Sequence, residues 1–151
     1  MANKFTVKLK KYADIINEYP AVAAITPGHL VELTSADKVQ AHGTEGGNAI
    51  PQFALEDELQ GKAITDAYAA DDRVFVWVAG RGDEVNAILA DGENVAIGDF
   101  LESKGNGTLK KWVAESATDV PNAIVGQALE AVDMSGSSGE DPSARIAIRI
   151  V

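Results

Sequence analysis

The chain offers few side chains of the kinds that catalyse reactions or hold metals. His29 and His42 are its only histidines, and their separation is not a metal-ligand spacing. Because there is no cysteine, thiol nucleophiles, disulfides and thiolate zinc sites are excluded. We therefore predict that both histidines are surface or hairpin residues rather than ligands or bases, and that the protein uses no metal or other cofactor.

Two clusters of carboxylates, Glu56-Asp57-Glu58 and Asp71-Asp72, are the remaining candidates for chemistry. Calcium could bind such groups, but the spaced oxygen ligands and the glycine of an EF-hand loop are missing. Paired acids can hydrolyse glycosides, yet an aromatic content of 6% argues against a sugar-binding cleft. The phosphate-binding glycine loops and Gly-x-Ser-x-Gly are also absent. We expect solvated turns and no enzymatic activity.

Three short matches to known motifs carry little weight in this context. Arg81-Gly82-Asp83 matches a cell-adhesion tripeptide, but it lies in an expected turn. Asn106-Gly107-Thr108 matches a glycosylation sequon, but without a secretion signal it is more simply a hairpin turn. The segment 34–39 faintly resembles the hairpin tip of lipoyl carrier domains, in which Lys38 would carry the swinging arm.

The segment from Asp72 to Trp112 determines the predicted fold class. Short β-branched and aromatic runs are separated by Gly, Asp and Asn about every eight to twelve residues, which is typical of an antiparallel sandwich or barrel. Within it, residues 74–78 are apolar on both faces, so this strand is expected in the core or at a subunit interface. These residues are Val74, Phe75, Val76, Trp77 and Val78.

Turn signals and alternation predict the other strands. The clearest hairpin spans 100–109, because Asn106-Gly107 supplies the positive φ angles of a tight turn. Another hairpin is predicted over 29–41. Short strands are expected at 51–56 and 145–150, and residues 122–132 favour a strand over a helix because a proline precedes them and Gly126 interrupts them. Residues 135–143 are expected to form a loop.

The N-terminal residues are predicted to form an arm over residues 1–20, ahead of a single β-rich domain over 21–151. Residues 4–9 alternate, with Phe5, Val7 and Leu9 on one face and Lys4, Thr6 and Lys8 on the other. The spacing of apolar residues between 10 and 18 allows one or two helical turns, which Pro20 would end. This segment could pack on its own body or on a neighbour.

Charge is unevenly distributed along the chain. The net charge is −10, yet residues 1–11 carry four lysines and no acid. The rest of the chain is acidic enough that it should repel nucleic acid. The basic N-terminal residues are then either an arm that binds an acidic protein surface or a solvated tail. There is no run of 18 apolar residues and no apolar signal-peptide segment, so we expect no membrane partner and folding in a cytoplasm.

Several segments, taken in order, resemble the capsid decoration (cement) proteins of tailed bacteriophages. They are Pro27–Leu33, Ile64–Val74, Ile97–Ser103 with Gly105–Leu109, Val125–Ala131 and Arg145–Ile150, within a region that covers about four fifths of the chain. No one segment is diagnostic. The order, the length and the lack of cysteine carry the resemblance, so the family's functional residues cannot be transferred one by one.

The resemblance implies a non-enzymatic protein on the outer capsid surface of a virion, assembled in the host cytoplasm. It would bind the major capsid protein and itself, as a homotrimer, and stabilise contacts between capsid subunits. The basic arm would add a strand to a capsid edge. The expected capsid-binding residues are Lys4, Phe5, Val7, Lys8, Leu9, Lys10, Lys11 and Tyr12.

Two other classes fit the composition. One is another phage or bacterial structural β protein, such as a tail-tube, head-fibre or adaptor component. The other is a β-barrel carrier or enzyme domain, for which a covalently modified Lys38 would be the sign of a carrier.

Overall fold

The computed structural model describes residues 4–114, 123–136 and 144–151, and these residues form mainly antiparallel β-structure. Its elements are β1 (Lys8–Lys10), β2 (Ile16–Pro20), β3 (Val31–Leu33), β4 (Val39–Ala41), β5 (Gln52–Ala54), the 3-10 turn η1 (Glu58–Gln60), β6 (Arg73–Val78), β7 (Glu84–Ile88), β8 (Asn94–Val95), β9 (Phe100–Ser103), β10 (Leu109–Lys111), β11 (Ile124–Ala128), β12 (Val132–Asp133) and β13 (Arg145–Ile150). The predicted β class is confirmed.

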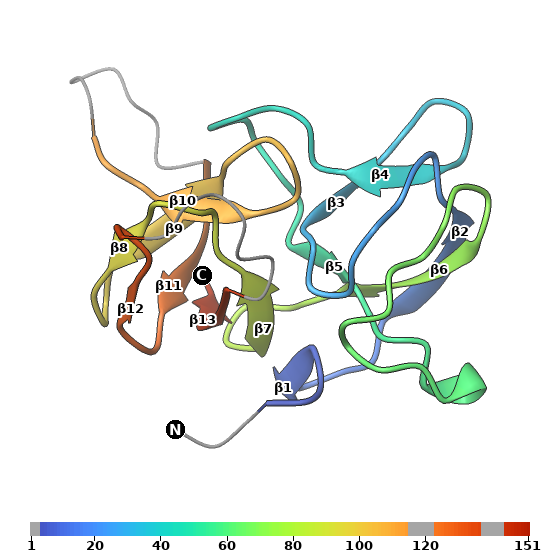
Figure 1. Cartoon of the computed structure of the whole chain (residues 1–151), viewed down its shortest axis with the longest axis horizontal. Coiled ribbons are helices and arrows are strands. Elements are labelled where there is room, and N and C mark those ends of the chain that lie inside the picture. Colours follow the sequence, from blue (N-terminus) through green and yellow to red (C-terminus); the bar gives the residue numbers. More distant parts are fainter. Residues whose placement is uncertain (1–3, 115–122, 137–143) are drawn as a thin grey trace.

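Two halves lie side by side (Figure 1). One holds a six-stranded sheet in the order β1-β7-β13-β11-β9-β10, with the small β12-β8 pair beside it. The other holds the sheet β2-β6-β5 and the hairpin β3-β4. The sheets form a sandwich-like arrangement rather than the closed barrel that was the alternative, although an isolated parallel bridge joins Leu89, after β7, to Leu109 of β10.

Strand β6 lies between two hydrophobic cores, because its side chains alternate. Val74 and Val76 are buried in a core shared with the β3-β4 hairpin. Trp77 is buried in the larger core, which reaches the six-stranded sheet, and the half-buried Phe75 packs against that core. An apolar pattern on both faces therefore marks a strand covered on both sides within one chain.

Most predicted strands and hairpins are present. The pairs β3-β4 and β9-β10, the strand β5 and the terminal strand β13 all lie where the turn signals placed them. Residues 124–128 are a strand, as predicted, in register with β13. The β9-β10 connection is a loop rather than a two-residue turn, and its positive φ angles fall on Gly105 and Gly107. Residue 122 and residues 137–143 of the predicted loop lie outside the described residues.

The prediction of helical turns in the N-terminal segment was wrong. Residues 16–20 are strand β2, paired along its length with β6, so the predicted helical turns over 10–18 are absent. The β-ladder was favoured because Ile16 and Tyr19 pair across strands with the apolar residues of β6. Residues 8–10 form β1, an edge strand of the six-stranded sheet, so of the two alternatives for this segment its described part packs on its own body.

Candidate interaction surface

The four lysines of the N-terminal segment all pair with acids of their own chain. Lys8 and Lys11 both contact Asp14, with Lys8 Nζ at 3.1 Å. The ammonium of Lys4 lies 2.8 Å from a carboxylate oxygen of Glu130, and that of Lys10 lies 3.6 Å from Glu84. Pairs as exposed as that of Lys10 contribute about 0–1 kcal/mol each, so a partner's carboxylates could replace them at little cost.

The apolar side chains of the same segment divide between the core and solvent. Val7 is fully buried in the large core, and its N–H donates to Glu56 Oε2 at 3.1 Å. Leu9 is half-buried, whereas Phe5 is 73% exposed and Tyr12 is 97% exposed. The predicted single apolar face is therefore not available to a partner as a unit, because Val7 already belongs to the protein's own core.

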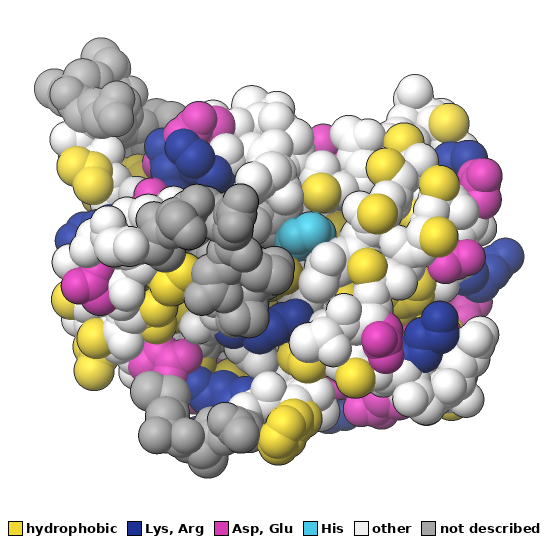
Figure 2. Space-filling view, in the orientation of Figure 1, with side chains coloured by type: hydrophobic (Ala, Val, Ile, Leu, Met, Phe, Trp, Pro, Cys, Tyr) yellow, Lys and Arg dark blue, Asp and Glu magenta, His cyan; other side chains and the backbone are white. Residues whose placement is uncertain are grey.

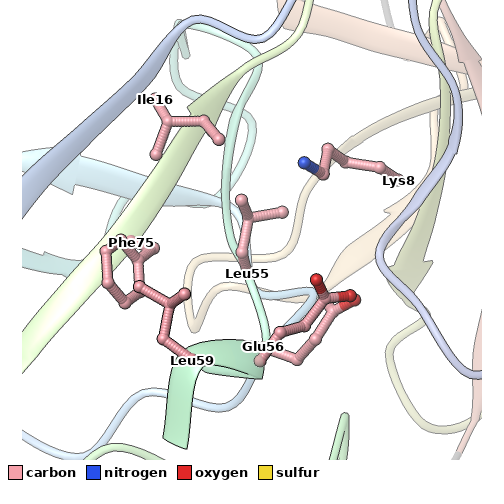
Figure 3. Close-up of a pocket in the computed structure, with 7 residues that line it drawn as sticks. Lys8, Ile16, Leu55, Glu56, Leu59 and Phe75 are labelled. Atoms are coloured by element: carbon pink, nitrogen blue, oxygen red, sulfur yellow. The ribbon is translucent and has the colours of Figure 1, made fainter.

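An apolar groove of about 270 Å³ lies beside this segment (Figure 3). Ile16, Phe75 and Leu59 lie on one side of it, Leu55 lies between, and Lys8 and Glu56 lie on the other side. Glu58 completes the lining. Leu59, on the 3-10 turn η1, is 86% exposed. Exposed apolar residues gathered at a groove are typical of an interaction site.

Sequence reasoning did not identify Leu59 and Ile16 as site residues. Leu59 stands in a polar, turn-like stretch, and Ile16 was assigned to a helical pattern, although both are large apolar residues near acids and turns. The groove forms because β2 pairs with β6 and brings Ile16 beside Phe75. A pairing between segments so distant in sequence is not visible in local periodicity.

His42 directly follows the β3-β4 hairpin, but it is buried, at 3% exposure, so it is not at the surface as one of the two predicted placements had it. Its Nδ1 lies 2.7 Å from Ser103 Oγ and its Nε2 lies 3.1 Å from the Asn48 carbonyl. Because a carbonyl only accepts, Nε2 carries the hydrogen and Nδ1 accepts from the serine hydroxyl. Ser103 also accepts from the N–H of Gly105 and has no exposed surface, so this serine–histidine contact ties two hairpins together and is closed to a substrate.

His29 is partly buried and lies within the field of the positive charge of Arg145. Desolvation by burial, helped by the positive charge of Arg145, lowers the pKa of His29 to about 4. Its Nδ1 accepts a hydrogen bond from the Thr26 N–H at 3.2 Å, which requires the neutral ring. Arg145 itself donates to the carbonyls of Pro27 and Ile64 and so joins β13 to the loops of the other half. His29 is therefore a packed structural residue.

Many of the acidic residues close turns. In four places an aspartate N–H donates to the carbonyl three residues earlier, and its carboxylate accepts from the N–H of that same residue. The pairs are Ala63–Asp66, Ala69–Asp72, Gly80–Asp83 and Ala96–Asp99. This is a local reason for aspartate that needs no ligand. Within the described residues no group of three histidines or acids is placed to hold a metal ion.

The three short motifs also have local structural roles. Asp83 is buried, and its Oδ1 also accepts from the Tyr12 N–H at 2.7 Å, so Arg81-Gly82-Asp83 does not present its carboxylate. Lys38 pairs with Asp71 at 2.6 Å. Asn106 lies in the β9-β10 loop, where its side chain accepts from the Thr108 N–H.

The rest of the visible surface is mixed in character. Figure 2 shows hydrophobic side chains spread over both halves of one face, with acidic and basic side chains between them. Other exposed apolar residues include Ile97 at 70% and Ile50 at 61%. No helix among the described residues is long and apolar enough to cross a membrane.

Comparison with known proteins gives a likeness of fold. No protein-family model matches the chain, and no curated protein matches its sequence. Among solved structures, the head fibre gp8.5 N base of bacteriophage phi29 is similar, with a TM-score of 0.58 and 15% sequence identity. The match covers 92% of this chain and 95% of that one. The chain therefore shares, over nearly its whole length, the fold of a structural component of a phage head.

Proposed function

We propose that this chain is a structural protein of a phage head that binds the outer surface of the capsid. The observation that carries the proposal is the likeness of fold to a head fibre base across nearly both whole chains. The sequence segments between residues 27 and 150 that resemble decoration proteins independently support a place on the phage head. The proposed partner is the major capsid protein.

Features of the surface support a binding role rather than catalysis. The groove between β2 and η1 is mainly apolar, and the N-terminal segment that supplies Lys8 to its lining also carries Tyr12 and Phe5, which have most of their surface in solvent. The buried serine–histidine pair has no access for a substrate. With weak exposed ion pairs, we infer that several copies bind together, as a homotrimer, so that avidity holds the protein on the head.

A second candidate function is the base of a head fibre, which would also bind the head but carry a further fibre domain or partner. The fold likeness favours it directly, because the similar structure is such a base. A cement protein would raise head stability, whereas a fibre base would leave head stability unchanged.

Light scattering of the purified protein, followed by co-sedimentation with expanded empty phage heads, tests the proposal. We expect a trimer that co-sediments with heads in a saturable way, and the thermal stability of heads with and without the bound protein separates cement from fibre base. The double variant Phe5→Ser with Tyr12→Ser should lose head binding, since both side chains are exposed and their loss leaves the core intact. The matched control Ile97→Ser, in an exposed turn, should bind normally. A wild-type protein that binds no head would overturn the proposal.

A further inference from the structure

Strand β2 is the open edge of the sheet β2-β6-β5. The Val78 N–H donates to the Ile15 carbonyl and the Ala21 N–H donates to the Asp72 carbonyl, which fixes the odd-numbered residues as those that bond to β6. The backbone groups of Ile16, Glu18 and Pro20 then point away from the sheet. Proline occupies one of these outward positions, where its missing N–H breaks no bond of the sheet.

Two outward N–H groups, those of Ile16 and Glu18, have no acceptor among the described residues. Their side chains lie on the groove side of the sheet, because their cross-strand partners are Trp77 and Phe75 of the large core. A strand added at this edge would therefore place alternate side chains directly beside the groove. An edge strand next to an apolar groove is the arrangement used in recognition by strand addition.

The charges around this edge favour a basic partner. Glu18, Glu56 and Glu58 are acidic, whereas the one lysine in the groove lining, Lys8, is already paired with Asp14. Glu18 has only a loose, exposed contact with Arg73, at 3.6 Å. Glu56 is 6% exposed, and its Oε1 has no hydrogen-bond partner among the described residues. Negative charge at the edge and in the groove would repel a second copy of the same acidic strand.

We propose that the β2 edge and the adjoining groove bind an extended segment of the capsid protein that carries an apolar and a basic residue two positions apart, so that both side chains face the groove side of the sheet. The segment pairs antiparallel or parallel with β2 through the outward groups of Ile16 and Glu18. Its apolar side chain enters the groove between Leu59, Phe75 and Ile16, and its basic side chain lies beside Glu18. The source of the segment rests on the proposed function, but the site and its chemistry do not.

The test uses a synthetic peptide, Thr-Val-Thr-Lys-Thr-Val-Thr, whose valines and lysine share one face of an extended strand; it is titrated into the full-length protein and followed by amide NMR. We expect saturable shifts and slowed hydrogen exchange at the N–H groups of Ile16 and Glu18, because these become hydrogen-bonded. The counterpart Thr-Val-Thr-Glu-Thr-Val-Thr, which differs only in the charge that faces Glu18, should bind at least about tenfold more weakly. Equal binding of the two peptides, or shifts only at other residues, would overturn the proposal.

Two variants locate the site. Glu18→Pro removes an outward N–H while Asn17 and Tyr19 keep their bonds to β6, so peptide binding should be lost with the fold intact. Glu18→Gln removes the charge alone and should weaken binding about threefold to tenfold. Leu59→Ser, at an exposed groove residue, should weaken binding similarly, whereas the matched exposed control Ile97→Ser should not. Unchanged binding by Leu59→Ser and Glu18→Gln would overturn the assignment even if Glu18→Pro failed to fold.

The outcomes separate this inference from the proposed function. If the protein binds heads and Glu18→Gln and Leu59→Ser bind them equally well, the strand-addition site is wrong while the function stands. If the peptide binds at β2 but no head does, the site is real and the proposed function fails.

Discussion

At the scale of single residues, the polar groups that initially suggested chemistry serve the fold. His42, His29 and the turn-closing aspartates each have a local partner that accounts for their type. The sequence could exclude thiol chemistry and most nucleotide-binding motifs outright. It could not tell that His42 is buried, because burial of a polar residue depends on partners such as Ser103, which is distant in sequence.

The depressed pKa of His29 predicts a dependence of stability on pH. Since the folded pKa, about 4, lies below the ordinary value of 6.5, the unfolded state binds a proton more readily between these pH values. The free energy of unfolding should be highest above pH 6.5 and should decrease by up to about 3 kcal/mol as the pH is lowered toward 4. Urea unfolding across this range measures the slope.

The control for that measurement is His29→Asn, which keeps an acceptor for the Thr26 N–H but does not titrate. Its stability should change little between pH 6.5 and about 4.5. Both proteins should also lose stability as pH falls through about 4.5 and below, because hydrogen bonds from lysines lower the pKa of Asp14, Glu45 and Asp99, and this loss is common to the two proteins. Identical slopes in the two proteins above pH 4 would show that His29 titrates normally.

Asp83 is expected to be the most important of the turn-closing aspartates. Its carboxylate is buried and accepts from the N–H groups of Gly80 and Tyr12. Asp83→Ala leaves both donors unsatisfied and should cost about 3 kcal/mol in the free energy of unfolding. Asp66→Ala, which removes one bond at an exposed turn, should cost about 1 kcal/mol by the same denaturation measurement. Equal losses of stability in the two variants would mean that the burial of Asp83 does not strengthen its contribution to folding.

At the scale of elements, turn chemistry predicted well because it is local. Hairpins with glycine or asparagine between apolar runs appeared where expected, and the closing strand 145–150 pairs with β7 and β11. The error at β2 has the opposite cause. Residues 10–20 contain apolar residues whose spacing fits a helix about as well as a strand, and only pairing with β6 decides between them.

The β9-β10 loop gives a sharp test of glycine's role. Gly107 has φ +80°, and an added Cβ would lie 2.9 Å from the ring of His29 and 3.0 Å from Ala41. Gly92 has φ +81° but nothing within 4 Å. In both Gly107→Ala and Gly92→Ala the positive φ angle costs about 1–2 kcal/mol of stability. The close contacts of the added Cβ should destabilise Gly107→Ala by about 1 kcal/mol more. Thermal unfolding of the pair measures the difference, and equal melting temperatures would contradict the close packing.

At the scale of the whole molecule, the two halves share the large core. Val7, Trp77 and Ile148 come from distant parts of the chain and are buried in it together. Arg145 adds hydrogen bonds from β13 to the carbonyls of Pro27 and Ile64. The halves should therefore unfold together rather than one after the other.

The two tryptophans make this measurable. Trp77 lies in β6, whereas Trp112 follows β10 in the other half, where its backbone N–H donates to the Phe100 carbonyl. In Trp112→Phe, the fluorescence reports on Trp77 alone. Its unfolding curve should coincide with that of the wild-type protein followed by circular dichroism, within the small shift caused by the substitution. Two separated transitions would show that the halves are independent.

The sequence by itself determined the β class, the positions of most hairpins, the doubly apolar strand 74–78 and the acidic surface, because these follow from local turn chemistry, alternation and composition. Only the tertiary structure decided that the basic N-terminal segment lies on the body, with Val7 in the core, and that β2 leaves an open edge beside a groove. Those features depend on which distant strands pair, and pairing is set by the burial of the whole chain rather than by any short stretch of it.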